Sequence, residues 1–423
     1  MDEFDPCIDI GPSEKAKDCF FNIKELELKG NLKKVESPFK ILEGRSISQN
    51  SVESVGIKNP MVFEQSRVPL RYESWKRLND LITEKVENSI TGFNNFFNIK
   101  KDLYYSNFTA TSLVFPRNPF KLNKFKYKNE IQEVLPLELN EYHFLLDYIH
   151  SSSTAFVLTP DIRIKEDTIS IDNYLKLIDE SVQILSERNS KPIFVPLQIQ
   201  LKVKDFTKIL SHYKKKKYTN LWINFNSRHI GGTNFAHVRR LLRNIDMEMG
   251  LTNTVLYYSH MKKEVNPNIK EIDSIGSDVI SQFVGADFIG VNETPPGFFN
   301  KDAQARIDQR IAQGEFKDKI DYLRAKDLNR SRIFDPGSYY YTNLENYPNK
   351  LPFDKNTLIK NSEINKFLNS VIINGEVLRT KEYVKNNGKI KPYLQNKKCF
   401  NENEHILDTI IEKSRQSGIL NYF

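Results

Sequence analysis

The chain has 423 residues, a formal net charge of +8 and three cysteines. A chain of this length can bury a sizeable core and can hold more than one domain. Cys7, Cys19 and Cys399 form no C-x-x-C motif, so neither a disulfide framework nor a cysteine zinc site is expected. The acidic N-terminus lacks the apolar region of a signal peptide, and no stretch reaches the ~18 apolar residues needed to span a bilayer. We therefore expect a cytoplasmic protein without membrane contact, and the modest positive charge leaves a nucleic-acid or phosphorylated partner open.

Residues 1–55 are polar and are expected to form an N-terminal appendage. Within it, apolar alternation over residues 23–28, followed by Gly30-Asn31, predicts a small hairpin. Beyond it, the spacing of apolar residues predicts strands at 60–63 and 108–115 and helices at 72–97 and 137–149.

Six short apolar runs, each followed by a helical stretch or a long connection, dominate the next part of the chain. They occupy residues 155–159, 192–196, 220–224, 254–258, 286–291 and 332–334. Strands this apolar are usually buried on both faces, and helices between them imply parallel pairing. With the two earlier strands they predict an α/β fold, a TIM (β/α)8-like barrel over residues 56–345. An open doubly wound sheet is the rival, but no glycine-rich nucleotide loop follows any strand, which favours the barrel.

A basic, helical C-terminal extension is expected over residues 346–423. Helices are predicted at 302–313, just before the last strand, and at 358–372 and 405–417 in the extension. The lysines between the last two helices could pack on the barrel or contact a polyanion.

Residues that follow the apolar strands are the candidates for function, because active sites of parallel α/β folds collect where the strands end. Asp161 and Glu293 are the candidate catalytic carboxylates. Partial burial at a strand exit raises the pKa of a carboxyl group toward the range useful for proton transfer. Alternatively, Asp161 caps a turn or the next helix, and Glu293 pairs with a nearby arginine.

Polar side chains at the other strand ends are candidates for ligand binding. They are Gln198, Gln200, Asn224, His260 and Asn292. Gln198 and Gln200 lie two residues apart, so both can point inward to a hydrogen-bonding ligand, or they satisfy loop backbone instead. His260 has no H-x-H or H-E-x-x-H companion, so no metal site is expected and no cofactor is implied.

The loop at residues 226–233 is a candidate anion or phosphate pocket. Gly231 and Gly232 let the backbone approach a ligand, and the N–H groups of the following helix lie beside Arg228 and His229. The same residues also fit an ordinary turn between a strand and a helix. Neither a Walker A sequence nor G-x-G-x-x-G occurs, which disfavours nucleotide hydrolysis and dinucleotide redox chemistry.

Four stretches occur in a distinctive order. They are Phe156-Val-Leu-Thr-Pro-Asp161, Pro192-Ile-Phe-Val-Pro-Leu-Gln198, residues 222–232, and residues 276–291 with Gly285-Ala-Asp-Phe288. This order resembles the tRNA-guanine transglycosylase superfamily, whose (β/α)8 barrel exchanges a base in a nucleic acid through a carboxylate nucleophile. In that resemblance the four stretches correspond to the strand with the base-contacting aspartate, the strand with the base-binding glutamine, the glycine-containing loop and the helix and strand that deliver the nucleophile.

Three positions depart from the family's pattern. Ile162-Arg163 and Ile199-Gln200 stand where the family has Gly-Gly pairs, and Gly290 stands at the position of its nucleophilic aspartate. The zinc-binding cysteines are also absent. The resemblance therefore implies that Glu293, or less readily Asp287, supplies the nucleophile, or that base exchange has been lost.

The resulting hypothesis is an enzyme that exchanges or binds a guanine- or deazaguanine-type base in a nucleic acid through a carboxylate pair. Asp161 would act as acid/base or contact the base, Glu293 as nucleophile, and Gln198 and Asn224 would bind the base. One alternative is a catalytically silent barrel that binds RNA or DNA, as partner of an active subunit in a homo- or hetero-oligomer. Another is a barrel lyase or hydrolase that uses the loop at residues 226–233 for a phosphorylated small substrate.

Overall fold

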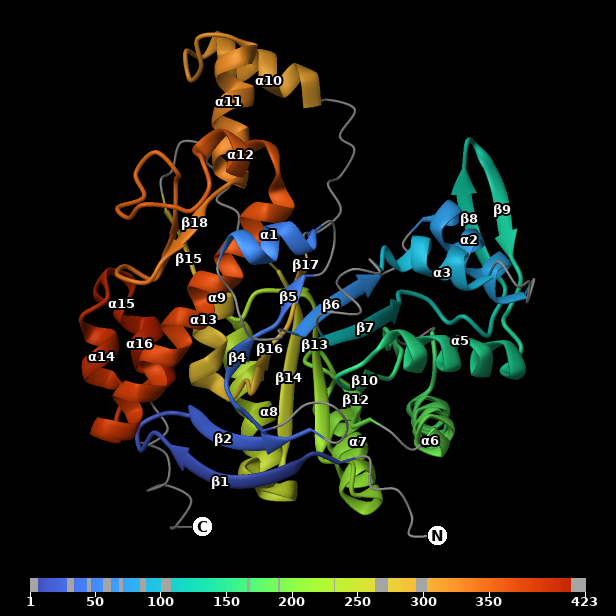
Figure 1. The fold of residues 1–423 in the computed structure, drawn as a ribbon. Coiled ribbons are helices and arrows are strands. Elements are labelled where there is room, and N and C mark those ends of the chain that lie inside the picture. Colours follow the sequence, from blue (N-terminus) through green and yellow to red (C-terminus); the bar gives the residue numbers. More distant parts are fainter. Residues whose placement is uncertain are drawn as a thin grey trace.

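The computed structural model describes residues 7–28, 34–43, 47–55, 62–67, 71–83, 89–99, 108–165, 168–188, 191–231, 233–262, 273–293 and 303–411. Figure 1 shows a mixed α/β architecture, with parallel strands at the centre and helices around them. Within these ranges, none of the helices combines the length and the apolar character needed to cross a bilayer.

The central sheet contains six parallel strands in the spatial order β10, β12, β13, β14, β16 and β4. Their bounds are β10 Val157–Leu158, β12 Ile193–Gln198, β13 Asn220–Arg228, β14 Val255–Lys262, β16 Phe288–Ile289 and β4 Phe39–Lys40, and β17 (Asn292–Glu293) also pairs with β14. Every side chain of β12 is buried, as are the first six of β13. Burial on both faces explains why these segments show no polar alternation in the sequence.

A second parallel sheet contains four strands in the order β11, β7, β6 and β5. Their bounds are β11 Asp161–Ile162, β7 Phe108–Phe115, β6 Val62–Arg67 and β5 Leu42–Glu43. The chain passes from the central sheet to this second sheet twice, from β4 to β5 and from β10 to β11, and it returns from β7 to β10 and from β11 to β12. Pro160 stands at the passage from β10 to β11, and because proline has no N–H it cannot continue a ladder. The residues before it therefore pair with β12, and those after it pair with β7.

The prediction of a TIM (β/α)8-like barrel is wrong. The central sheet is a six-stranded parallel half-barrel, and its ladder does not close into one ring of eight strands. The expected eighth strand, at residues 332–334, is β18 (Ile333–Asp335), which belongs to an antiparallel sheet with β15 (Asp273–Ile275) and β19 (Tyr340–Thr342). The neighbour of β16 is instead β4, from the polar N-terminal segment. A two-residue strand that contains a lysine carries no apolar period, so sequence patterns do not reveal it.

An antiparallel sheet covers the amino ends of the central strands, below them in Figure 1. It consists of β1 (Asp9–Lys15), β2 (Asn22–Glu27) and β3 (Lys34–Glu36). The pairing of β2 with β3 confirms the hairpin expected there, and its turn lies outside the described residues. Ile8 and Leu26 join the same apolar cluster as Phe194 and Trp222 of the central sheet. Apolar side chains of the N-terminal sheet therefore cover the amino ends of the central strands.

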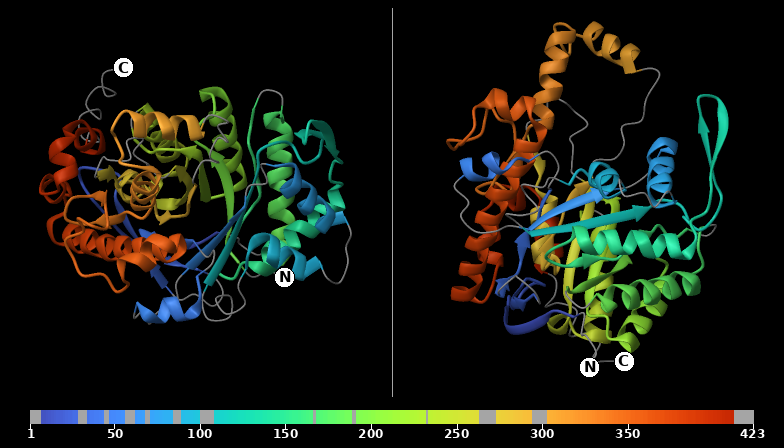
Figure 2. Two further views of the ribbon diagram at one scale, coloured as in Figure 1. Left: turned by 90° about the horizontal axis from the view of Figure 1, so that it is seen from above. Right: turned by 45° about the vertical axis from the view of Figure 1, so that its right-hand side comes forward.

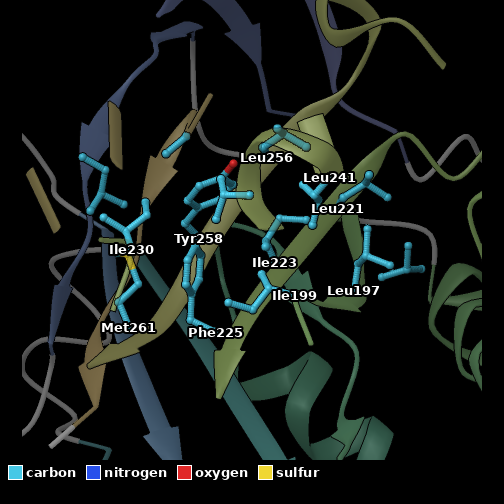
Figure 3. Close-up of a cluster of buried hydrophobic side chains, with 14 of the residues drawn as sticks. Leu197, Ile199, Leu221, Ile223, Phe225, Ile230, Leu241, Leu256, Tyr258 and Met261 are labelled. Atoms are coloured by element: carbon cyan, nitrogen blue, oxygen red, sulfur yellow. The ribbon is translucent and has the colours of Figure 1, made fainter. Parts of the chain in front are cut away.

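Helices that alternate with the strands pack on the outer face of the central sheet. They are α5 (Leu139–Ser152), α6 (Ile171–Glu187), α7 (Val203–Lys216) and α8 (Thr233–Met249), with short turns α9 (Ser277–Ile280), η1 (Leu251–Asn253) and η2 (Ser281–Val284). Figure 3 shows this packing, in which Ile223 of β13 and Tyr258 of β14 share one buried apolar cluster with Leu241 of α8. The apolar stripes of these helices therefore support the sheet from outside.

The helix expected over residues 72–97 is two helices, α2 (Tyr72–Thr83) and α3 (Ser89–Phe97). An antiparallel hairpin, β8 (Asn123–Tyr127) and β9 (Glu130–Val134), follows β7, and α1 (Gln49–Ser54) precedes β6. Apolar spacing continued across the break between α2 and α3, so periodicity alone did not reveal it.

Helices also make up most of the C-terminal part, on the opposite side from α2 and α3 in the view from above (Figure 2). They are α10 (Ala303–Ala312), α11 (Lys319–Arg330), α12 (Lys355–Lys360), α13 (Ser362–Asn387), α14 (Lys391–Gln395), α15 (Lys398–Glu402) and α16 (Glu404–Ile411). The predicted helix at 302–313 corresponds to α10, and the one at 405–417 overlaps α16, with residues 412–417 outside the described part. The one at 358–372 spans the end of α12 and the first part of α13, while α11 was not predicted.

Candidate functional site

Seven buried polar side chains lie in the middle of the parallel strands or at their carboxyl ends, and we call them the polar layer. They are Glu64, Ser112, Asp161, Gln198, Asn224, Ser259 and His260. Each is at most 2% exposed. A buried polar group costs free energy unless it is hydrogen-bonded, so the partners of these side chains define the site.

Asp161 is the centre of one half of the polar layer. Its Oδ1 accepts hydrogen bonds from the Tyr174 hydroxyl at 3.0 Å and from Gln198 Nε2 at 2.9 Å, and its Oδ2 accepts one from Asn224 Nδ2 at 2.6 Å. Desolvation by burial raises the pKa of Asp161, and the hydrogen bonds from Asn224, Gln198 and Tyr174 oppose that rise. The nearby His260 also acts against the rise. The carboxyl group is thus held by neutral donors in a site that disfavours its charge.

The structure brings Asp161, Gln198 and Asn224 together, as their strand-end positions predicted. The side-chain amides of Gln198 and Asn224 both form hydrogen bonds to other groups of the protein. Gln198 Nε2 also donates to the Ile162 carbonyl at 2.8 Å, and its Oε1 accepts from the Ile164 N–H at 3.2 Å. Asn224 Oδ1 accepts from the Asn226 N–H at 2.9 Å. In this state the two amides orient Asp161 and the adjoining loops, and base binding by them stays a prediction.

The backbone at this edge adopts unusual conformations. Asn226, Ser227 and His260 have φ of 49°, 62° and 56°, in the left-handed region that non-glycine residues rarely occupy. The pairing of β13 with β14 shifts register between Asn224 and Arg228, which is a bulge. Bulges and left-handed residues tend to cluster at functional sites, where they re-aim side chains. His260 is turned in this way toward Ser112 on β7, with Nε2 3.5 Å from the serine Oγ.

Glu64 is the centre of the other half of the polar layer, and it is fully buried. Its Oε1 accepts a hydrogen bond from the Ser112 hydroxyl, and its Oε2 accepts from the Tyr257 hydroxyl and from the Val291 N–H at 3.3 Å. His260 Nε2 lies 4.0 Å from Glu64 Oε1. Since His260 also influences Asp161, it connects the two halves of the layer.

Trp222 borders the polar layer beside His260. Its ring centroid lies 5.8 Å from that of His260, and its Nε1 donates a hydrogen bond to Ser259 Oγ at 2.6 Å. The chain has only two tryptophans, and the other, Trp75, lies in α2. Trp222 is therefore a built-in reporter of the polar layer.

Gly290 sits against the polar layer and has no room for a side chain. A Cβ atom there would lie 2.7 Å from Ser259 Cβ, 2.8 Å from the Tyr257 hydroxyl and 2.8 Å from the Tyr258 carbonyl oxygen. The position implied by the family resemblance for the nucleophile is therefore filled by side chains from β14.

The remaining predicted residues lie apart from the layer or outside the described part. Gln200 and Arg228 are exposed, Gly231 is half-buried, and His229 is half-buried with its pKa lowered by burial and by Lys262. Gly232 and the side chain of Glu293 lie outside the described residues. The backbone of Glu293 pairs with Lys262 at the carboxyl end of β14.

Asn292 belongs to a separate cluster between the sheet and α13. Its Nδ2 donates to Asp278 Oδ2 at 2.8 Å, and the Tyr341 hydroxyl donates to the same carboxylate at 2.9 Å. Lys40 Nζ lies 3.6 Å from Asp278 and donates to the Gly290 carbonyl at 2.7 Å, and burial lowers the pKa of Lys40. These residues line a cavity of about 50 Å³, which has space for a few water molecules.

Asp287, the second predicted nucleophile, precedes β16 and therefore lies at the amino ends of the strands. It forms an ion pair with Lys24 at 2.8 Å. Asp287 is thus at the opposite end of the sheet from Asp161, which removes it as a partner of that carboxyl group.

Sequence reasoning missed Glu64, Ser112 and the layer they form. The predicted strand ended at Phe63, one residue before Glu64. A carboxylate two residues after the inward-facing Val62 was the available signal, because a charged side chain in a parallel strand is rarely buried without a role. Among the described residues, no group of three His, Cys, Asp or Glu side chains is placed to hold a metal ion. Neither a protein-family model nor a curated protein matches this chain.

Proposed function

We propose that the polar layer binds a guanine- or deazaguanine-type base of a nucleic acid and that the protein exchanges this base in a transglycosylase-like reaction. One observation carries the proposal: Asp161 is a buried carboxyl group that is held by neutral donors at the carboxyl ends of parallel strands. Structural carboxylates in protein interiors are usually paired with a cation. A carboxyl group kept without one, beside left-handed backbone, is a candidate for proton transfer.

A guanine-type base matches the chemistry of this half of the layer. Its Watson–Crick edge carries N–H donors beside a carbonyl acceptor, and a carboxylate accepts from the former while an amide donates to the latter. Asp161 would accept from the base, and Gln198 and Asn224 would exchange a bond to Asp161 for one to the base. The raised pKa of Asp161 also favours a protonated form that can give its proton to a departing base nitrogen.

Trp222 makes base binding measurable in the absence of turnover. The variant Trp75→Phe leaves Trp222 as the single tryptophan. We expect its emission to change on titration with guanine or 7-deazaguanine and not with cytosine. Binding is followed in turn by an exchange assay, in which radiolabelled guanine enters unfractionated tRNA or double-stranded DNA. A flat Trp222 signal with every purine, together with no label incorporated into either nucleic acid, would refute the proposal.

A catalytically silent nucleic-acid-binding protein is the second candidate, and the packing at Gly290 favours it. The space of a side chain at this position is occupied by Tyr257 and Ser259, so the resemblance supplies no nucleophile there. Such a protein would bind tRNA or DNA with an affinity that falls steeply with salt, but it would not incorporate labelled guanine. Filter binding at several salt concentrations, beside the exchange assay, separates the two functions. Either function would be carried out in the reducing cytoplasm, in keeping with Cys7, Cys19 and Cys399, which form no disulfide.

A further inference from the structure

Glu64 is a buried carboxylate that the family resemblance does not account for. It lies inside β6, its side chain has no solvent exposure, and its contacts are two hydroxyl groups, one backbone N–H and one imidazole. In the described part of the chain no lysine or arginine lies within ion-pair distance of it. An interior position of this kind costs free energy, which an ion pair would offset. The buried ammonium group of Lys40 interacts with Glu64 electrostatically but does not form an ion pair with it.

One carboxylate oxygen of Glu64 has an unused hydrogen-bond acceptor site. A carboxylate has about four acceptor sites, two on each oxygen. Oε2 uses both of its sites, for the Tyr257 hydroxyl and the Val291 N–H, whereas among the described residues the one donor to Oε1 is the Ser112 hydroxyl. His260 Nε2 lies 4.0 Å from Oε1, which is beyond hydrogen-bond distance. Oε1 is therefore an oriented oxygen with a spare lone pair.

The hydroxyl group of Tyr257 links Glu64 to the position of Gly290. A Cβ atom at Gly290 would lie 2.8 Å from the Tyr257 hydroxyl, and that hydroxyl donates to Glu64. Tyr257 thus fills the volume beside Gly290 and fixes there a carboxylate that comes from a different strand. Gly290 and Glu64 are therefore both in contact with the same hydroxyl group, that of Tyr257.

We infer that Glu64 Oε1 is the nucleophile of the proposed base exchange, delivered from β6 in place of a side chain at position 290. This inference rests on the proposed function. Oε1 attacks C1′ of the target nucleotide, so that a C1′–O bond forms while the C1′–N bond breaks. The electron pair of that bond leaves with the base nitrogen, which takes a proton from Asp161. In the second half the incoming base attacks C1′, the C1′–O bond breaks, and the incoming base returns its proton to Asp161.

The decisive experiment is to trap the covalent protein–nucleic acid intermediate and ask which glutamate it needs. Wild-type protein, Glu64→Gln, Glu64→Asp and Glu293→Gln are incubated with end-labelled tRNA or double-stranded DNA and separated on denaturing gels. We expect a labelled adduct in the wild type and in Glu293→Gln, and a loss of at least about a thousandfold in Glu64→Gln. Glu64→Asp keeps the charge but withdraws the oxygen, so its adduct should also be strongly reduced.

Two further measurements keep the outcome decisive. Trp222 emission with guanine shows whether Glu64→Gln still folds and binds a base, and Glu64→Asp serves if Glu64→Gln does not fold. An adduct that persists in both Glu64 variants and vanishes in Glu293→Gln would overturn this inference and leave the proposed function standing. Base binding and label exchange by the wild type without any adduct would likewise overturn it. Absence of base binding, exchange and adduct in the wild type would overturn both.

Discussion

The two ends of the parallel strands bury carboxylates in opposite ways. At the amino ends, Asp287 accepts hydrogen bonds from Lys24 Nζ at 2.8 Å, the Ser37 hydroxyl at 3.0 Å and the Leu256 N–H at 2.8 Å. Asp161 at the carboxyl ends and Glu64 inside β6 are equally buried, but their hydrogen bonds come from hydroxyl, amide and backbone donors, and neither forms an ion pair with a lysine or arginine of the described residues.

The presence or absence of a cationic partner distinguishes buried carboxylates with a structural role from those with a proposed functional role. The amino-end carboxylate is neutralised by a lysine from β2, which fastens the N-terminal sheet across the strands. Asp161 and Glu64 do not join a separate segment to the sheet in this way, because their hydrogen-bond partners come from neighbouring strands and helices that already pack together. A carboxylate that is buried and left without a cation retains the reactivity that an ion pair would quench.

The substitution Asp161→Asn tests the acid/base role of this carboxyl group, and it has the largest expected effect. Removal of the acid/base group should lower the rate of guanine exchange by about 10²- to 10⁴-fold, since general acid–base catalysis contributes factors of this size. The rate is measured by incorporation of labelled guanine, with Asn173→Ala, on α6, as a control outside the layer. If Asp161→Asn exchanged guanine at the wild-type rate, Asp161 would have a structural role and no catalytic one.

The sharpest test of the amino end is Lys24→Met. The change leaves Asp287 buried without its cation, and breaking such a pair costs about 3–5 kcal/mol of unfolding free energy. Urea denaturation measures this loss. Lys34→Met is the matched control, because Lys34 forms an exposed ion pair with Glu25 on the same sheet and its removal should leave stability almost unchanged. Exchange activity per folded molecule should be preserved in both variants. Its loss in Lys24→Met would contradict a purely structural role for the ion pair at the amino ends.

Gly290→Ala tests how tightly the carboxyl end is packed. The new methyl group would meet Ser259 Cβ and the Tyr257 hydroxyl at less than contact distance, and overpacking of this kind costs about 1–3 kcal/mol. The same shift of Tyr257 should disturb Glu64 and lower adduct formation. Thermal unfolding and the adduct assay measure the two effects, with Gly375→Ala as control, since a Cβ there meets no atom within 4 Å. A stable, fully active Gly290→Ala would contradict the proposed packing.

The pH dependence of stability is the smallest expected effect. Burial raises the pKa of Asp161, so between its ordinary value and its raised value the folded state holds a proton that the unfolded state releases. Stability should therefore fall as pH rises from about 4 through this window, by at most about 1.4 kcal/mol per pH unit. Urea denaturation from pH 4 to 7 should show this slope in the wild type and not in Asp161→Asn.

Asp172 supplies the control of opposite sign for that slope. Its exposed carboxylate is bonded to Lys208, which lowers its pKa, so the stability it contributes is lost as pH falls. Because this contribution has the opposite sign, the substitution Asp172→Asn should leave unchanged the fall of stability with rising pH that Asp161 causes. An unchanged slope in Asp161→Asn would show that Asp161 is not the group that titrates.

Local pattern predicted most individual elements of this fold. The strand expected at residues 108–115 is β7, with the same bounds, and the apolar runs up to residue 291 became parallel strands as their burial implied. The closed barrel failed because strand partners are chosen by long-range packing. The pairing of β4 with β16 joins distant parts of the chain, and its two residues carry no periodic signal.

The candidate site was only half predictable for the same reason. Asp161, Gln198 and Asn224 were identified because each stands at the end of an apolar run, where parallel strands place their functional groups. Glu64 lies inside a strand that the sequence resolved only in part, and its meeting with Ser112, Tyr257 and His260 involves three other strand positions. No local pattern encodes such a meeting.

The order of apolar runs by itself determined that parallel strands carry polar residues at one end, because hydrophobic burial and strand direction are local properties of the chain. Tertiary structure alone decided which carboxylates are paired with a cation. That choice depends on Lys24 reaching the amino ends, whereas no lysine or arginine in the described ranges forms an ion pair with Asp161 or Glu64, and both facts follow from the packing of segments far apart in the sequence.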